Sequence, residues 1–597
     1  MCWKRRLAVA PPAWPFDLEF LVRTTVRDHR WILADPPDEG LVATLAREIN
    51  VPESIAKILV FRGIADYDTA KVYFRPTMEL LHDPYLLDGM DKAVDRVLRG
   101  LAADEAFFVF GDYDVDGTNG AAMLYLFLKE MGARAQFYIP DRLKEGYGIS
   151  RMGIDHAVEL GVNLFIAIDC GITAVDQVAY ASQRGLDVII CDHHEAGPVL
   201  PPALAVLDPI KPGDPYPFKP LSGCGVGFKL IQGIARRLGK EDLLRPYLDF
   251  VTLASTADIV PLTGENRVLV KLGLENINSS PRPGIKALIE SAGLKLGRIT
   301  TGQIVFALAP RINAAGRLGD ATRAVRLLTS NDPEEARALA QELEEENRNR
   351  RKIDEDTFAD AQQLFEECFD VDSDPAIVLH QEHWHPGVVG IVASRMVERY
   401  YKPSIMMATV DGVAKGSARS VSGFDIYEAL KRCEDKILQF GGHKYAAGLT
   451  VEIERLEEFR EAFKAAVKDL MAEELKTPEI RIDMELGLQE ITPRFIKILR
   501  EFAPFGPNNS RPTFLTRGLE VAGTARIVGR NHLRFRVRHN GTSFDAIGFG
   551  LGELLPRVFS GRKDLECVYT VEENEWTPPS GSRSADPVPQ LKIKDLR

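Results

Sequence analysis

Cysteine is scarce in this sequence. Only seven cysteines occur in 597 residues, and no two have the Cys-x-x-Cys spacing that is typical of structural zinc sites and redox motifs. An odd, scattered set of this kind indicates reduced thiols rather than a disulfide framework. We therefore expect a cytoplasmic protein.

Long apolar runs are missing as well. No stretch approaches the roughly 18 apolar residues that a membrane-spanning helix needs. Lys4, Arg5 and Arg6 precede a short apolar segment, but Pro11 and Pro12 cut it short, so we do not interpret it as a signal peptide. We expect no membrane partner.

Excess positive charge is absent from the chain as a whole. The formal net charge of −12 argues against a nucleic-acid partner, because such proteins usually carry a basic surface. The charge is unevenly distributed, however. Residues 332–374 hold 16 acidic and 5 basic residues, whereas residues 511–563 hold 3 acidic and 10 basic residues. The acidity thus belongs mainly to one segment, whose helical pattern predicts a solvated helix that bridges two lobes.

The hydrophobic pattern predicts an α/β protein of several domains. Between residues 105 and 210, continuous apolar runs alternate with helical patterns, which indicates a buried parallel sheet. Residues 374–470 indicate a second α/β region. After residue 478 the chain is β-rich, and in residues 532–538 apolar and basic side chains alternate before Asn540-Gly541, a strong hairpin signal. We divide the chain into residues 1–80, 81–330, 331–372, 373–472 and 473–597.

Acidic residues follow three of the predicted strands. Gly111-Asp-Tyr-Asp-Val-Asp-Gly117 comes directly after the first strand, and two later strands end in Asp169-Cys-Gly and Asp192-His-His194. Sites in parallel sheets lie beyond the carboxyl ends of the strands. Carboxylates crowded there repel one another unless a cation neutralises them, and oxygen ligands with an imidazole favour Mn²⁺ or Mg²⁺.

Other interpretations of these residues are less suitable. A single aspartate at such a position is usually only a helix cap. An EF-hand would need a glutamate where Met123 stands. A zinc site made of Cys170, Cys191 and His193 would leave the carboxylates unexplained. Gly223-Cys-Gly-Val-Gly-Phe-Lys229 lacks the Gly-Lys-Ser/Thr of a phosphate-binding loop, so we interpret its glycines as a tight turn into a helix.

A bridging carboxylate with a ligand set on either side predicts a two-metal site. Such a site activates a water and stabilises both the attacking and the leaving oxygen of a phosphoryl transfer. We therefore expect phosphoester hydrolysis without a covalent intermediate. The predicted metal ligands are Asp112, Asp114, Asp116, Asp169 and His193, with Asp258 as a further candidate.

These motifs resemble the DHH phosphoesterase family, and within it the RecJ family of bacterial exonucleases specific for single-stranded DNA. The resemblance extends from about Trp31 over nearly all of the remaining chain, including Pro310-Arg-Ile-Asn-Ala-Ala-Gly-Arg317, Trp384-His-Pro-Gly-Val-Val-Gly-Ile391, Gly441-Gly-His-Lys-Tyr-Ala-Ala-Gly448 and Phe505-Gly-Pro-Asn-Asn509. It implies a DHH lobe at 81–330, a connecting helix, a smaller DHHA1 lobe and a C-terminal OB-like β-barrel. Residues 1–30 and the loop at 573–590 have no clear counterpart.

The resemblance also implies roles for single residues. Asp169 would bridge the two cations, and His194 would contact the scissile phosphate or the attacking water. Ser417 and Arg419 would hold a 5′-phosphate. The further substrate-binding residues would be Arg142, Tyr147, Arg311, Asn313, Arg317, His385, Gly441, Gly442, His443, Arg534, Arg536 and Arg538.

The expected function is removal of 5′-mononucleotides from single-stranded DNA, in DNA repair and recombination. The expected partners are a single strand with a 5′ end, a helicase and a single-strand-binding protein, and the protein is expected to be a monomer. Two alternatives remain: a phosphodiesterase of short oligonucleotides or cyclic dinucleotides, which would lack the OB-like region, and a non-catalytic replication scaffold, which would tolerate a broken ligand set.

Overall fold

The computed structural model describes residues 29–142, 144–574 and 588–597. Most of the expected N-terminal extension and of the 573–590 loop therefore lies outside the described residues. The chain forms two units. One contains the N-terminal residues to Pro36 with 351–496 and 512–597, and the other contains 37–350 with 497–511.

The larger unit is built on a five-stranded sheet in the order β3-β2-β4-β5-β6, in which every neighbouring pair is parallel. This confirms the predicted parallel sheet, and each strand coincides with one of the apolar runs. Side chains alternate across the sheet: Phe107 and Val109 join one core cluster and Phe108 and Phe110 the other. The strands are Ala106–Gly111 (β2), Arg134–Tyr138 (β3), Leu164–Ile168 (β4), Asp187–Cys191 (β5) and Ala205–Leu207 (β6).

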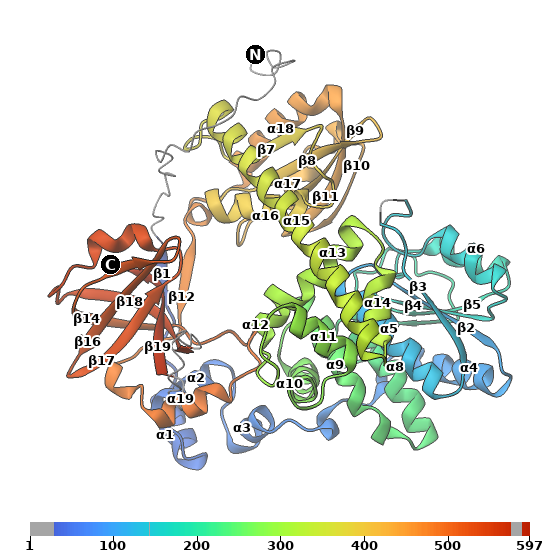
Figure 1. Ribbon diagram of the computed structural model, residues 1–597, viewed down its shortest axis with the longest axis horizontal. Helices are drawn as coiled ribbons and strands as arrows, with labels where there is room; N and C mark the ends of the chain where they lie inside the picture. The colour runs from blue at the N-terminus through green and yellow to red at the C-terminus, as the bar shows by residue number, and fades with distance from the viewer. Residues whose placement is uncertain (1–28, 143, 575–587) are drawn as a thin grey trace. The chain divides into compact units, whose positions relative to one another are not determined.

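Helices cover both faces of this sheet (Figure 1). The face that carries Phe107 packs against Met90–Ala102 (α4), Val115–Glu130 (α5) and Gly223–Leu238 (α8), and the opposite face packs against Arg151–Glu159 (α6) and Val175–Gln183 (α7). The remaining helices of the unit precede or follow the sheet. They are Glu39–Glu48 (α1), Glu53–Phe61 (α2), Tyr67–Phe74 (α3), Leu248–Ala257 (α9), Gly264–Ser279 (α10), Pro283–Ser291 (α11), Thr301–Gln303 (α12), Ala309–Leu318 (α13) and Thr322–Thr329 (α14).

The segment 497–511 is fastened to this unit by a buried arginine. Arg267 is only 4% exposed, and its guanidinium donates to the backbone oxygens of Tyr73, Phe502 and Ala503. Arg62 adds a hydrogen bond of 2.5 Å to Asn509 Oδ1. Because carbonyl oxygens satisfy the buried charge of Arg267 here, the segment is held by directional bonds as well as by apolar packing.

The acidic segment is a single 36-residue helix, Pro333–Cys368 (α15), which confirms the predicted long helix. It is less solvated than its composition suggests. Glu344 lies 2.6 Å from Arg311 on α13, and Glu346 pairs with Arg323 on α14. Arginines of the larger unit therefore offset part of the acidity, and they tie the first half of α15 to the helices beside the sheet.

The smaller unit contains a second α/β sheet with the order β10-β11-β9-β8-β7, in which only β7 and β8 are parallel. Its strands are Ile377–Gln381 (β7), Ser404–Val410 (β8), Val413–Arg419 (β9), Gln439–His443 (β10) and Ala446–Glu452 (β11), and its helices are Val389–Tyr400 (α16), Ile426–Lys431 (α17) and Leu456–Leu470 (α18).

The C-terminal region of this unit is a β-barrel. Strand β14 pairs with β18 and also with β16, which closes β14, β18, β19, β17 and β16 into a ring. Leu533, Phe535 and Val537 point into its core and Asn540-Gly541 forms the predicted hairpin turn. The strands are Glu479–Ile482 (β12), Met484–Glu485 (β13), Phe514–Val521 (β14), Arg526–Val528 (β15), His532–His539 (β16), Thr542–Gly548 (β17), Leu565–Asn574 (β18) and Val588–Leu596 (β19); Arg30–Leu33 (β1) pairs with β12, and Pro493–Arg500 (α19) precedes the barrel.

Within the described residues, no helix combines the length and the apolar character needed to cross a bilayer.

Candidate active site

The predicted metal ligands meet at one edge of the parallel sheet. Asp112 directly follows β2, Asp169 follows β4, and Asp192 and His193 follow β5. These three strands are neighbours in the sheet, so their carboxyl ends deliver the four side chains to the same place. The crossover helices cover the faces and leave this edge free for a site.

The cluster contains two ligand groups, and a third group overlaps both. Asp112, Asp114 and Asp169 form one group, and Asp116, His193 and Asp258 form the other; within each group the ligand atoms lie within 4.8 Å of one another. Asp169, His193 and His194 form the overlapping group. The two groups adjoin at Asp169, because its Oδ1 lies 3.2 Å from His193 Nε2. The same nitrogen lies 3.7 Å from Asp258 and 3.8 Å from Asp116. This arrangement suits two cations that share Asp169.

Asp114 both caps a helix and contributes to the cluster. It is the N-cap of α5, and its Oδ1 accepts hydrogen bonds from the backbone N–H groups of Asp116 and Gly117. The cap and the ligand interpretation are therefore compatible, since a carboxylate has a second oxygen. The positive end of the helix dipole also favours negative charge at this point.

The glycine-rich segment that resembled a nucleotide loop supports the cluster instead. The backbone N–H groups of Gly223 and Cys224, at the start of α8, donate to the two oxygens of Asp116 at 2.7 and 2.8 Å. A Cβ on Gly223 would come within 2.5 Å of Asp169 Oδ1, so only glycine permits this approach. Sequence reasoning missed this role; its one signal was Ser222 before a run of glycines, which is typical of a capped helix start.

Two residues at the cluster have left-handed backbone conformations. Asp169 has a φ of 63°, and Ile259, which directly follows Asp258, has a φ of 60°. This region is sparsely populated by non-glycine residues and is especially unfavourable for a β-branched side chain. Such strain persists where the surroundings demand a particular geometry, and it is common at functional sites.

The electrostatics of the cluster call for cations. Burial, followed by repulsion from neighbouring carboxylates, raises the pKa of Asp112 and of Asp169 well above the usual range and raises that of Asp258 to about 8. Three buried atoms, Asp112 Oδ1, Asp169 Oδ1 and His193 Nε2, have no hydrogen-bond partner. Unpaired buried polar atoms are costly. Oxygens with one imidazole nitrogen fit Mn²⁺ or Mg²⁺, and no cysteine joins a ligand group among the described residues.

Asp192 orients the second histidine. Its Oδ1 lies 2.8 Å from His194 Nδ1 and accepts the backbone N–H of His193, while its Oδ2 accepts the N–H of Ile172. Burial alone would lower the pKa of His194, but the hydrogen bond and charge of Asp192 raise it to about 9. The sequence did not reveal this role of Asp192. An aspartate that positions another residue and an aspartate that binds a metal look the same in a sequence motif.

Several predicted substrate residues lie beside this cluster. The Tyr147 hydroxyl lies 3.3 Å from His194 Nε2. The Arg142 guanidinium stacks 5.0 Å from the Tyr113 ring centroid, and its charge lowers the pKa of Asp112 against the larger effect of burial. The Arg317 charge lowers the pKa of Tyr113, again against a larger effect of burial.

Two other predicted substrate residues have structural contacts instead. Asn313 Oδ1 accepts the backbone N–H of Val115 at 3.1 Å. It therefore supports the segment 112–116, called the metal loop below. Arg311 is 5% exposed and is paired with Glu344. We therefore omit Arg311 from the proposed strand path, because its guanidinium is occupied by a carboxylate inside the fold.

The smaller unit holds the residues predicted to bind a terminal phosphate. Arg419 Nη1 donates to Ser417 Oγ at 2.6 Å on β9. The start of α16 lies against this pair, because a Cβ on Gly390 would come within 3.0 Å of Arg419 Nη2. Gly441, Gly448 and Ser417 are cross-strand neighbours, and both glycines leave open space above the sheet.

The other predicted substrate-binding residues of the second α/β region differ in exposure. Gly442 and His443 are exposed at the end of β10, which leaves them accessible to a ligand. His385 is half-buried, and its Nδ1 accepts the backbone N–H of Gly387 at 3.0 Å. Burial lowers the pKa of His385, so this side chain favours the neutral form.

The basic residues of the barrel share one face but are not free. Arg536 Nε lies 2.8 Å from Asp545, Arg534 lies 3.7 Å from the same carboxylate, and Arg538 pairs with Glu520 at 2.7 Å. Two carboxylates thus offset part of the positive charge that the sequence assigns to this strand.

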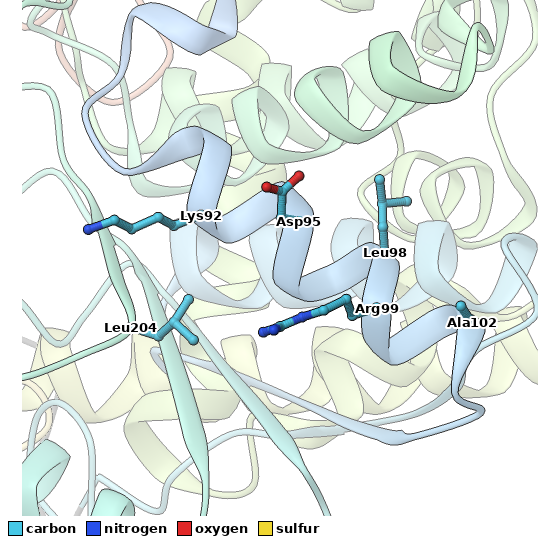
Figure 2. A pocket seen from close by; sticks show the side chains of 6 residues that line it. All are labelled: Lys92, Asp95, Leu98, Arg99, Ala102 and Leu204. Atoms are coloured by element: carbon cyan, nitrogen blue, oxygen red, sulfur yellow. The ribbon is translucent and has the colours of Figure 1, made fainter.

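A pocket elsewhere on the larger unit is an unsuitable site. It lies along α4 and is lined by Lys92, Asp95, Leu98, Arg99, Ala102 and Leu204 (Figure 2). Its single carboxylate pairs with Arg237, and the lining includes no group of metal ligands. The chemistry-bearing residues gather at the sheet edge instead.

The first turn of α8 yields a test of the cluster. Gly223→Ala should weaken Mn²⁺ binding by about tenfold or more, because the new methyl group would displace Asp169 and Asp116, and changes at such supporting contacts typically have effects of this size. Titration calorimetry with MnCl₂ measures this change. Gly225→Ala is the matched control, because its Cβ would meet no atom closer than 3.5 Å. Equal affinities in the two variants would contradict the assignment.

Three family models match the chain in succession. They are the N-terminal domain of the DHH family at residues 106–255, the DHHA1 domain at 373–469 and the RecJ OB domain at 482–584. The metal cluster adjoins the strands of the first match, and Ser417 and Arg419 lie in the second. The third match contains the barrel strands β14, β16, β17 and β18, and β19 follows it.

Curated relatives match along most of the chain. The single-stranded-DNA-specific exonuclease RecJ of Bacillus subtilis (strain 168) is 36% identical over 95% of this chain and 70% of the relative. That of Escherichia coli (strain K12) is 34% identical over 83% and 89%. The crystal structure of RecJ from Thermus thermophilus with Mn²⁺ superposes with a TM-score of 0.81 and 30% identity, over 95% of this chain and 79% of that one. The chain therefore belongs to the RecJ family of single-stranded-DNA-specific exonucleases.

Proposed function

We propose that this protein hydrolyses single-stranded DNA from its 5′ end and releases 5′-mononucleotides, in DNA repair and recombination. The observation that carries the proposal is the pair of ligand groups that meet at the buried Asp169. Family membership supplies the substrate class, and the printed names of the relatives supply the preference for single strands.

Two divalent cations, Mn²⁺ or Mg²⁺, held by Asp112, Asp114, Asp116, Asp169, His193 and Asp258, would lower the pKa of a bound water and offset the charge of the reacting phosphate. The remaining work falls to the chain itself. Asp192 holds His194 in one orientation through Nδ1, so that the other ring nitrogen, Nε2, lies beside the Tyr147 hydroxyl. From there His194 would donate a hydrogen bond to the scissile phosphate, with Tyr147 and Arg142 beside it.

The 5′ polarity follows in this proposal from Ser417 and Arg419. A hydroxyl beside a guanidinium is a good clamp for a terminal phosphate. The bare surface at Gly441 and Gly448 lets a phosphate approach the backbone closely. A strand held by its terminal phosphate is engaged at its 5′ end, which is the polarity proposed here.

The barrel would bind the strand through its basic face. Such a face attracts the phosphate backbone without reading sequence. Its presence favours long substrates over dinucleotides, and the complete ligand set favours an enzyme over a scaffold. We further propose that the protein acts as a cytoplasmic monomer with a helicase and a single-strand-binding protein as partners. The thiols of Cys170, Cys191, Cys224, Cys433 and Cys567 are free in the described structure, which is consistent with a reducing compartment.

Label release tests the proposal directly. With Mn²⁺ or Mg²⁺, a 5′-labelled single strand should lose its label before a 3′-labelled one, a duplex should resist hydrolysis, and a chelator should stop the reaction. Asp169→Asn should abolish hydrolysis because it removes the shared charge, while circular dichroism remains unchanged. Earlier release of the 3′ label would refute the polarity, and an active Asp169→Asn variant would refute the metal assignment.

The proposed phosphate clamp makes a second prediction. Arg419→Ala should remove most of the preference for a 5′-phosphate over a 5′-hydroxyl end, a loss of about ten- to a hundredfold in relative kcat/KM, because hydrogen bonds to charged groups contribute about 1.5–3 kcal/mol. Arg455→Ala is the control, since this arginine of the same lobe pairs with Glu458. An unchanged preference in Arg419→Ala would exclude the clamp.

The paired arginines of the barrel make a third prediction. Asp545→Asn should tighten binding to single strands and steepen its salt dependence, because it frees Arg534 and Arg536 for phosphate contacts, each of which adds about 0.7 to the slope. Neutralising Arg534, Arg536 and Arg538 together should flatten the dependence. Asp435→Asn, which disrupts an exposed pair with Lys436, serves as the control. Fluorescence anisotropy at several salt concentrations measures the slopes, and identical slopes would disprove a role for this face.

A further inference from the structure

A π-helical turn stands immediately before α13. Residues Ile304–Leu308 form this turn, and the backbone N–H of Ala309 donates to the oxygen of Ile304. Pro310 explains the widening, because a proline has no N–H and its ring would crowd the oxygen of Phe306 four residues earlier in a regular helix. Arg311 Nη1 also donates to Ala307 O at 2.6 Å. Such turns are rare and are frequent at functional sites.

The π-turn presents Phe306 to solvent. Its side chain is 78% exposed, the largest value among the large apolar residues of the part of the chain that the structure describes. A single exposed apolar side chain is not unusual by itself. Here, however, the exposed ring coincides with an irregular turn that a proline imposes, and the turn is continuous with a helix that supports the metal loop.

Phe306 shares a face with residues beside the metal cluster. From Leu308 to Arg317, the positions that are not buried are Pro310, Asn313 and Arg317. Spacings of three and four residues place Pro310, Asn313 and Arg317 along one side of α13. The π-turn places Phe306 about one turn before Pro310.

One end of this face is attached to the metal loop. Asn313 accepts the N–H of Val115, and Gly316 lies so close to Tyr113 that a Cβ would come within 2.5 Å of its backbone oxygen. At 1.5 Å per residue, Phe306 lies about 10 Å along the helix axis from Asn313. A strand that leaves the metal cluster along this face would reach Phe306 within a few nucleotides.

We propose that Phe306 is a stacking platform for an unpaired base of the DNA strand close to the metal cluster. Aromatic side chains stack on any base, so the contact suits an enzyme without sequence preference. A base inside a duplex is already paired and stacked on both faces, so the platform favours single strands. This inference rests on the proposed function, which supplies the strand.

The test compares variants of the full chain on a single strand of about 20 nucleotides, long enough to extend past the platform. Phe306→Ala should raise KM about tenfold or more with little change in kcat, because stacking contributes about that much per base, and Phe306→Trp should restore the KM. The tryptophan fluorescence of Phe306→Trp should be quenched by oligo(dT) beyond the quenching of the unaltered protein. Tyr67→Ala is the control, since Tyr67 is a 52% exposed aromatic residue of the same unit, outside the Phe306 face.

The outcomes separate this inference from the proposed function. Failure of the unaltered protein to hydrolyse single strands would overturn both. Normal activity of the unaltered protein with an unchanged KM in Phe306→Ala would overturn the platform alone. A lowered melting temperature in Phe306→Ala, without restoration of KM by Phe306→Trp, would identify Phe306 as a packing contact and would also overturn it.

Discussion

The crowding of buried carboxylates at one edge of the parallel sheet is the constraint on which the rest of the structure depends. Asp112, Asp116 and Asp169 are almost completely buried, although neighbouring negative charges disfavour ionisation of each of them. Such an arrangement persists only if cations are bound or protons are retained. Binding of divalent cations would therefore release protons and stabilise the fold at the same time.

The surrounding helices contact the carboxylates at this edge closely. The first turn of α8 directs two N–H groups at Asp116, and Gly223 leaves room for Asp169. On another side, α13 holds the metal loop through Asn313 and is itself tied to α15 by the pair of Arg311 and Glu344. The acidic helix thus joins the two lobes in sequence and also braces the helix that supports the site.

The charge distribution has a consistent physical explanation. The net charge of −12 describes neither the site nor the basic barrel. Arginines of α13 and α14 offset part of the acidity of α15, and Asp545 and Glu520 offset part of the basicity of the barrel. The positive charge available to a DNA strand is therefore smaller than the sequence count of residues 511–563 implies. It depends on whether Asp545 and Glu520 remain paired with the arginines of the barrel.

The sequence by itself determined the strands, the long helix, the hairpin and the acidic residues that gather at the candidate metal site, because apolar periodicity and acidic residues after strands are local signals. Only the tertiary structure decided the role of the glycine-rich segment, since Gly223 meets Asp169 through a contact between residues distant in the chain. It also separated Arg311, which is buried against Glu344, from Arg317, although both belong to one motif. Burial and pairing depend on which residues pack against a side chain in the fold, whereas a sequence motif specifies only the type of residue.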